Sequence, residues 1–249
     1  MQCVILAGGL GTRIKGRGGD LPKALIPVLG KPFIVYQLEW LARQNVRRIL
    51  LSIGHRGAAI AQAMGDGSPF GVSITYCDEG ENLRGTGGAL RLAADRGLLD
   101  AGFFVLYGDS YLPIELAPLW HTSESGRVPT MAVMQNRSRW DRSNVVFEDG
   151  RIVLYDKSVG GRAENAMDYI DYGVSVLPRN VITEGFSAGE VADLSTLLNR
   201  LSVDGKLKGH EIFERFYEIG SPQGLEEFEE LVRNQLNHPA SHPDGFTRR

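Results

Sequence analysis

The sequence of 249 residues lacks paired cysteines, a long apolar run and an excess of basic residues. Its two cysteines, Cys3 and Cys77, lie in apolar stretches, so we expect buried thiols in a reducing cytoplasm rather than a disulfide. Because no apolar run is long enough to span a bilayer, we expect no membrane association. The formal net charge of −3 argues against a nucleic-acid surface, which normally carries a clear basic excess. Without a CxxC motif or a histidine-rich cluster, a zinc site is not expected either.

Strand-like and helix-like segments alternate through the first half of the chain, which predicts βαβ units and a mostly parallel sheet. In the first expected helix, Ile34, Leu38 and Leu41 recur at helical spacing and form one buried stripe. Helices on both faces of the sheet complete a Rossmann-like α/β fold. The expected strands are 2–7, 48–53, 72–77 and 103–107, and the expected helices are 32–45, 56–64 and 87–97.

The second half is less regular and predicts antiparallel strands. The Asp-Gly pair at 149–150 is a strong hairpin signal within the strand pair expected at 144–156. Pro222 opens a last helix, because proline is favoured at the first helical position. We expect one domain over 1–235 and a disordered polar tail over 236–249. Other expected elements are strands at 129–135, 168–177 and near 214–219, and a helix at 192–202.

The stretch from residue 4 to 28 carries the most specific signal in the chain. An apolar strand ends abruptly in the run GGLGTR at 8–13, where glycines let backbone N–H groups approach a ligand closely. A concave run of such donors forms a phosphate cradle, and two cations, Arg13 and Lys23, follow it. We therefore expect a site for several phosphates. Its candidate nucleotide-binding residues are Leu6, Ala7, Gly8, Gly9, Gly11 and Thr12.

Two well-known phosphate-binding motifs do not fit this loop. A dinucleotide fingerprint needs G-x-G-x-x-G, but Ile14 occupies the third glycine position. A P-loop needs its lysine between Gly and Ser or Thr, whereas Lys23 lies between Pro22 and Ala24. The plain alternative is a strand-to-loop turn that merely uses glycine, and the motifs farther along the chain argue against it.

Two carboxylates that follow apolar strands are candidate metal ligands. Asp109 follows the run FFVLY at 103–107, and ligands of open α/β sheets bind beyond the carboxyl ends of the strands. Mg²⁺ bridges phosphates with only one or two carboxylates, so Asp109 suits that ion. Glu218 ends another apolar stretch just before a helix. An equally good interpretation is that Glu218 is a surface residue near a helix start, where the helix dipole favours a negative charge.

Three weaker signals complete the set. Glu79 offers a carboxylate that can accept two hydrogen bonds from the N1–H and amine edge of guanine, but suits uracil or thymine poorly. Its alternative is a solvated loop charge. Lys157 follows a strand and matters only if it faces the cleft. A glycine-rich helix start offers backbone donors to a nucleotide or sugar hydroxyl, unless the glycines serve only the helix itself; its residues are Gly85, Thr86, Gly87 and Gly88.

Taken together, these motifs resemble the sugar-1-phosphate nucleotidyltransferases over nearly the whole chain, from Met1 to about Val232. The most specific are LAGGLGTR at 6–13 and PKAL at 22–25; Gly-Asp at 108–109 and EIGSP at 218–222 follow in the expected order. The resemblance implies a nucleotide-diphospho-sugar transferase fold with an antiparallel sugar-binding subregion. It also implies that a sugar 1-phosphate attacks the α-phosphorus of a nucleoside triphosphate and that pyrophosphate leaves.

The resemblance implies roles for individual residues. Arg13 would hold the β- and γ-phosphates and Lys23 the phosphates at the reacting centre. Asp109 and Glu218 would bind Mg²⁺, although the family usually has aspartate where this chain has Glu218. Lys157 matches the lysine that grips the sugar phosphate, in Asp-Lys-Ser rather than the common Glu-Lys-Pro. The Asn-Ala-Gly segment that often contacts the sugar is replaced by Asp171, Tyr172 and Gly173, which are therefore the residues expected to bind the sugar phosphate together with Lys157.

The segments LPKAL, GTGGAL and YEIGSP look most like bacterial heptose 1-phosphate guanylyltransferases and relatives acting on mannose 1-phosphate. GTP and such a sugar 1-phosphate are therefore the expected substrates. A uridylyltransferase for an N-acetylated sugar such as N-acetylmuramic acid 1-phosphate shares nearly the same framework, including a similar glutamate in the loop that holds Glu79, and stays open.

Three further questions stay open. A non-catalytic nucleotide-sugar sensor is an alternative. The presence of Arg13, Lys23 and Asp109, which match the family's phosphate and metal ligands, argues against it. A glycosyltransferase would normally want Asp-x-Asp after the strand, but Asp109 is followed by Ser110 and Tyr111. The aromatic residues of the second half fit a homodimer interface or ordinary core packing equally well.

Overall fold

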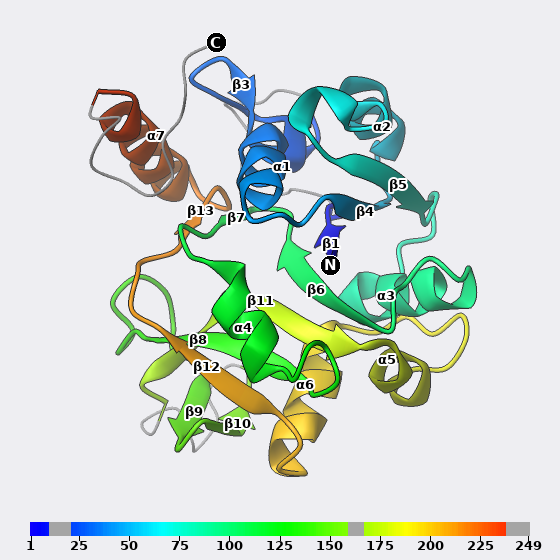
Figure 1. Cartoon of the computed structure of the whole chain (residues 1–249), viewed down its shortest axis with the longest axis vertical. Coiled ribbons are helices and arrows are strands. Elements are labelled where there is room, and N and C mark those ends of the chain that lie inside the picture. The colour runs from blue at the N-terminus through cyan, green and yellow to red at the C-terminus, as the bar shows by residue number, and fades with distance from the viewer. Residues whose placement is uncertain (10–20, 159–166, 238–249) are drawn as a thin grey trace.

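The computed structural model describes residues 1–9, 21–158 and 167–237. A nine-stranded mixed sheet forms its centre, with the strand order β5-β4-β1-β6-β11-β8-β12-β10-β9 (Figure 1). The first four strands in this order are parallel to one another, as expected from alternating strands and helices. They are β1 (Gln2–Leu6), β4 (Arg48–Ile53), β5 (Ser73–Asp78) and β6 (Gly102–Tyr107), joined through α1 (Phe33–Arg43), α2 (Gly57–Met64) and α3 (Gly85–Asp95).

The other half of the sheet is mixed. Figure 1 shows β11, β8 and β12 leading from β6 toward the β9–β10 hairpin. β11 runs antiparallel to both β6 and β8, whereas β12 is parallel to β8. The carboxyl ends of β8 and β12 therefore lie on the same edge of the sheet as those of β1 and β6. The strands are β8 (Thr130–Gln135), β9 (Val145–Glu148), β10 (Arg151–Tyr155), β11 (Tyr169–Pro178) and β12 (Lys208–Ile212).

Apolar side chains fill both faces of the sheet. Along β1, Val4 belongs to one buried cluster, whereas Cys3 and Ile5 belong to the other. Strands buried on both faces read as continuous apolar runs, which explains why these segments were recognisable in the sequence. One face packs on α1, α2, α4 (Leu116–Thr122) and α7 (Pro222–Asn237), and the other on α3, α5 (Arg179–Gly185) and α6 (Leu194–Val203).

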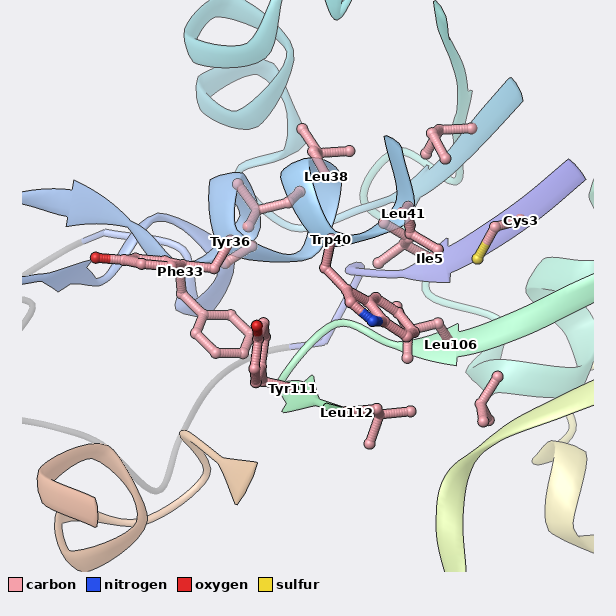
Figure 2. Packing of buried hydrophobic residues seen from close by; sticks show 14 of the residues in the cluster. Cys3, Ile5, Phe33, Tyr36, Leu38, Trp40, Leu41, Leu106, Tyr111 and Leu112 are labelled. Carbon is pink, nitrogen blue, oxygen red and sulfur yellow. The ribbon is translucent and has the colours of Figure 1, made fainter. Parts of the chain in front are cut away.

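Aromatic packing fixes the position of the last helix. The Phe228 ring of α7 lies 5.2 Å from that of Phe33 and 4.9 Å from that of Tyr111, measured between centroids. Figure 2 shows Phe33 and Tyr111 meeting in the core beside Trp40 of α1. Full burial of one such ring stabilises a fold by about 1.5–3 kcal/mol. These contacts hold α7 near Tyr111. The short strand β13 (Tyr217–Glu218), which precedes α7, is held in the same place and pairs with β7 (Ser110–Tyr111).

Several sequence expectations need correction. The strand expected near 214–219 shrinks to Tyr217–Glu218, because only these residues find a pairing partner. β12, which was not expected, enters the central sheet. The helix expected at 192–202 begins at Leu194, after Asp193 caps the Ser195 amide. α7 includes residues 236 and 237 of the expected tail, and the rest of that tail lies outside the described residues.

The short elements are η1 (Lys23–Leu25), β2 (Pro27–Val28), β3 (Lys31–Pro32) and η2 (Ser68–Phe70). Among the helices of the described ranges, none has the length and apolarity required to cross a membrane.

Candidate active site

A cavity of about 370 Å³ opens at the carboxyl ends of β1, β4 and β6. This is the edge at which open α/β sheets bind ligands. The site residues expected from the sequence that line it are Leu6, Ala7, Gly8, Gly9, Lys23, Glu79, Gly85, Thr86 and Asp109. The expected residues Gly11, Thr12 and Arg13 lie outside the described residues.

Two of the glycines let the chain approach closely around this cavity. A Cβ atom at Gly8 would lie 2.9 Å from Glu79 Oε1, and one at Gly108 would lie 2.7 Å from the Leu6 carbonyl oxygen. Contacts this short require a neighbouring group to shift. Gly8 thus allows the Glu79 carboxylate to stand at the cavity wall, and Gly108 allows β6 to turn into the site beside β1.

Lys23 and Asp109 form an ion pair in the cavity, although 86 residues separate them in the chain. Lys23 Nζ lies 2.7 Å from Asp109 Oδ2. η1 places the lysine, and the carboxyl end of β6 places the aspartate. The two side chains are 20% and 37% exposed, so a ligand in the cavity can reach both. The structure therefore brings together the cation and the carboxylate that the sequence assigned to one phosphate site; their roles remain predictions.

Glu218 lies on the strand next to Asp109. It pairs with Ser110 across β13 and β7, and the Ile219 amide donates to the Asp109 carbonyl oxygen at 2.9 Å. Its carboxylate turns toward the start of α7 and accepts hydrogen bonds from the Gly220 amide and the Ser221 hydroxyl. Glu218 therefore lies both at the start of α7 and on the strand beside the candidate metal ligand, and its two interpretations, a charge favoured by the helix dipole and a metal ligand, remain predictions.

Within the described part of the chain, no three His, Cys, Asp or Glu side chains gather into a metal-binding group. Mg²⁺ does not need such a group, because one or two carboxylates suffice when substrate phosphates supply further oxygens. Asp109 in the cavity, with Glu218 on the adjacent strand, fits this requirement. The residues present therefore suit a magnesium ion that arrives with a nucleotide.

A second polar cluster borders the cavity through Tyr107, which lines it. Lys157 Nζ lies 3.3 Å from Asp171 Oδ2 and 4.9 Å from the centroid of the Tyr107 ring. Tyr172 does not join this cluster. Its side chain is buried in the core on the other face of the sheet, 5.9 Å from the ring of Phe216. Of the three residues expected to contact the sugar, the structure thus places Asp171 beside Lys157 and Tyr172 away from it.

Gly173, the third of these residues, serves the backbone. It has a φ of +101°, a conformation that favours glycine. Its amide donates to Asp171 Oδ1 at 3.0 Å, and a Cβ atom there would lie 3.2 Å from Ser110 Oγ. Gly173 therefore helps to hold Asp171 and lets β11 approach β7.

The start of α3 uses two of its predicted donors within the chain. The amides of Gly87 and Gly88 donate to the Ala192 carbonyl oxygen at 2.9 and 3.1 Å, so they do not face a ligand. A Cβ atom at Gly87 would lie 2.4 Å from the Phe186 ring. Gly87 and Gly88 therefore allow the start of α3 to pack closely against segment 186–192, whereas Gly85 and Thr86 line the cavity.

Replacing Gly88 with alanine should destabilise the protein. Alanine gains about 1 kcal/mol of helix propensity over glycine. The new Cβ atom would lie 2.4 Å from the Glu190 carbonyl oxygen, and overpacking of this kind typically costs about 1–3 kcal/mol. Because the obstructing atom is backbone, we expect a cost near the upper end of this range and a net loss of up to about 2 kcal/mol in the free energy of unfolding, measured by urea titration. A variant more stable than the wild type would contradict this prediction and would show that segment 186–192 moves aside at little energetic cost.

The sequence reasoning missed several cavity residues, among them Ser52, Leu83 and Tyr107. Ser52 and Tyr107 lie within the last two positions of the expected strands 48–53 and 103–107, which neighbour β1. Because the carboxyl ends of neighbouring parallel strands share an edge, that signal was available. Leu83 lies in an irregular loop, and its sequence carries no comparable signal.

Comparison with known proteins agrees with this geometry. Residues 2–139 match the nucleotidyl transferase family. A D-glycero-alpha-D-manno-heptose 1-phosphate guanylyltransferase from Campylobacter jejuni is 28% identical over 94% of this chain and 100% of its own length. An N-acetylmuramate alpha-1-phosphate uridylyltransferase from Neisseria meningitidis is also 28% identical, over 93% of this chain and 98% of its own.

Among solved structures, HddC from Yersinia pseudotuberculosis complexed with GMP-PN superimposes with a TM-score of 0.73. The two are 25% identical, and the match covers 93% of this chain and 99% of HddC. The chain therefore belongs to the nucleotidyl transferase family. The resemblance to sugar-1-phosphate nucleotidyltransferases and the α/β fold class expected from the sequence are both confirmed.

Proposed function

We propose that the chain transfers GMP from GTP to a heptose- or mannose-type sugar 1-phosphate, releasing pyrophosphate, with Mg²⁺ as its metal ion. The choice of guanine rests on Glu79 in the cavity wall. Its Oε2 accepts a hydrogen bond from the Arg84 amide at 2.7 Å, which fixes the carboxylate. Burial raises the pKa of Glu79 more than this hydrogen bond lowers it, as expected for a carboxylate facing a partly dry cavity.

A fixed carboxylate discriminates between nucleobases by their hydrogen-bonding edges. Guanine presents two adjacent donors, N1–H and the exocyclic amine, and a carboxylate can accept from both. Uracil and thymine present a single N–H between two carbonyl oxygens, whose lone pairs would face the carboxylate. Glu79 therefore favours GTP, in agreement with the guanylyltransferase named above. Because the chain is also similar to an N-acetylmuramate alpha-1-phosphate uridylyltransferase, UTP with N-acetylmuramic acid 1-phosphate is the second candidate substrate pair.

The reaction requires alignment and charge neutralisation more than covalent help from the protein. The sugar phosphate is already an anion at neutral pH, so its attack on the α-phosphorus needs no general base. Repulsion between the two anions is the main obstacle, and Lys23, Lys157 and Arg13 would reduce it at the phosphates. Asp109 and Glu218 would hold Mg²⁺, which when bound neutralises charge on the phosphate oxygens.

The test is pyrophosphate release by the purified protein across GTP, UTP, CTP and dTTP, each combined with a panel of sugar 1-phosphates. We expect the highest kcat/KM with GTP and a heptose or mannose 1-phosphate. A higher value for UTP with N-acetylmuramic acid 1-phosphate would replace the proposal with the second candidate. Nucleotide binding without turnover across the panel would indicate a sensor instead of an enzyme.

Replacing Glu79 with glutamine should weaken nucleobase discrimination. A hydrogen bond to a charged group contributes about 1.5–3 kcal/mol, so we expect kcat/KM for GTP to fall about ten- to a hundredfold while that for UTP changes little. The ratio of the two values is the measurement. Glu81→Gln makes the same chemical change at an exposed position of the same loop and should leave the ratio unchanged. An unaltered ratio in Glu79→Gln would remove Glu79 from base recognition.

A further inference from the structure

The carboxylate of Asp171 is almost completely buried beside a lysine that remains accessible. The Asp171 side chain is 3% exposed and that of Lys157 is 42% exposed, with Nζ and Oδ2 separated by 3.3 Å. A buried charge is costly unless it is paired and hydrogen-bonded. Asp171 meets both conditions, so the interior holds one partner rigidly while the other keeps access to solvent.

Hydrogen bonds fix the carboxylate from several sides. Oδ1 accepts from the Gly173 amide at 3.0 Å, and Oδ2 accepts from the Tyr155 hydroxyl at 3.1 Å. The Asp171 amide donates to Asn144 Oδ1 at 2.9 Å. Because hydrogen bonds hold its backbone amide and both carboxylate oxygens, Asp171 presents the Lys157 ammonium with an anion in a fixed position.

Two aromatic rings flank the ammonium. Lys157 Nζ lies 4.9 Å from the centroid of the Tyr107 ring and 5.6 Å from that of Tyr155, within range of cation–π attraction. Tyr107 lines the cavity and precedes Asp109 by two residues. The ammonium is therefore held beside Tyr107, a residue that lines the candidate phosphate site.

We propose that Asp171 is a positioning residue, which holds the Lys157 ammonium beside Tyr107 so that it meets the phosphate of the sugar 1-phosphate already charged and oriented. The inference rests on the proposed role of Lys157 in binding that phosphate. Asp171 thereby acts through Lys157 and need not touch the substrate itself.

The electrostatic surroundings of Lys157 support this role. The groups facing it are Tyr107 from β6, Tyr155 from β10, Asp171 from β11 and Asp193 just before α6. Burial alone would lower the pKa of Lys157, but attraction to Asp171 and Tyr107 outweighs it, and the pKa rises above its usual value. The lysine therefore stays charged throughout the neutral range. Without the Asp171 charge, burial would act with less opposition and the pKa would fall.

Asp171→Asn isolates this role because it keeps the shape of the side chain. The amide oxygen can still accept from the Gly173 amide. The NH₂ group then occupies the position of Oδ2 and turns a donor toward Lys157, which has only donors. The variant thus reverses the interaction with the lysine while preserving the bond that supports β11.

The experiment measures steady-state pyrophosphate release with the nucleotide and sugar 1-phosphate that the wild type uses best. For Asp171→Asn, we expect KM for the sugar 1-phosphate to rise about ten- to a hundredfold, with KM for the nucleotide nearly unchanged. kcat/KM should also decline as the pH rises from 7 to 9.5, whereas the wild type shows no such decline from Lys157. Asp168→Asn, the same change at an exposed position just before β11, should match the wild type.

A double-mutant cycle separates positioning from a purely structural role. If Asp171 acts through Lys157, adding Asp171→Asn to Lys157→Ala should cause no further loss of kcat/KM. A full additional loss, or an unchanged KM for the sugar 1-phosphate in the single variant, would overturn the proposal. Failure of the wild type to turn over any sugar 1-phosphate would instead overturn the proposed function.

Discussion

Replacing Asp109 with asparagine should reduce the kcat of pyrophosphate release by about 10³-fold while the fold remains intact. The substitution keeps the shape of the side chain but removes the negative charge at the carboxyl end of β6 that we propose binds Mg²⁺. Removing one preorganised electrostatic group from an active site typically costs about 2.7–4 kcal/mol of transition-state stabilisation. Because Asp109 is 37% exposed, its loss should disturb the cavity far more than the core.

The structure provides a matched control for this variant. Lys206 and Asp204 form an ion pair of the same residue types on an exposed turn, with Nζ and Oδ2 separated by 3.3 Å. Asp204→Asn should leave both kcat and the thermal midpoint unchanged, because exposed pairs contribute little. An Asp109→Asn enzyme that retains full activity would end the assignment of Asp109.

Replacing Lys23 with methionine should lower kcat/KM for the nucleotide by about 10²-fold or more, again by comparison with the loss of one preorganised electrostatic group. Methionine keeps most of the volume of the side chain but removes the charge that faces the phosphates. In the free protein Lys23 is bound to Asp109 at 2.7 Å, so the variant also leaves that carboxylate without its partner.

Lys206→Met is the control for this change and should match the wild type in all kinetic parameters. The direction of the ionic-strength effect provides a second readout. If Lys23 acts on phosphate charge, the salt dependence of nucleotide binding should become weaker in Lys23→Met, because one cation fewer attracts the triphosphate. Unchanged nucleotide affinity and unchanged kcat together would show that Lys23 only pairs with Asp109.

The strands that could be predicted from the sequence are those that the fold buries on both faces. β4 and β6 are covered on both faces, so their apolar runs mark them directly. β12 was missed because its sequence KGHEI shows neither an apolar run nor a clear alternation, although Gly209 and Ile212 are buried. Residues 214–219 contain more aromatic side chains but form only a two-residue strand, since a neighbouring strand is available only at Tyr217–Glu218.

The same reasoning explains which contacts of the site could be predicted. Lys23 and Asp109 both follow or flank recognisable motifs at one sheet edge, so their meeting in one cavity was expected. The pairing of Lys157 with Asp171 was not, because it depends on the strand order that brings the ends of β10 and β11 together through β9. Likewise, GTGG at 85–88 reads as a ligand loop, and only the fold shows that Ala192 accepts from two of its amides.

The most direct measurement is a crystal structure of this chain with a non-hydrolysable GTP analogue and Mn²⁺, in which anomalous scattering locates the metal. We expect the triphosphate in the cavity beside Lys23, and a metal peak within coordination distance of the Asp109 carboxylate and a phosphate oxygen. Glu218 should be the next nearest carboxylate. A nucleotide bound at another face of the sheet, or a metal that contacts neither Asp109 nor Glu218, would contradict the proposed site.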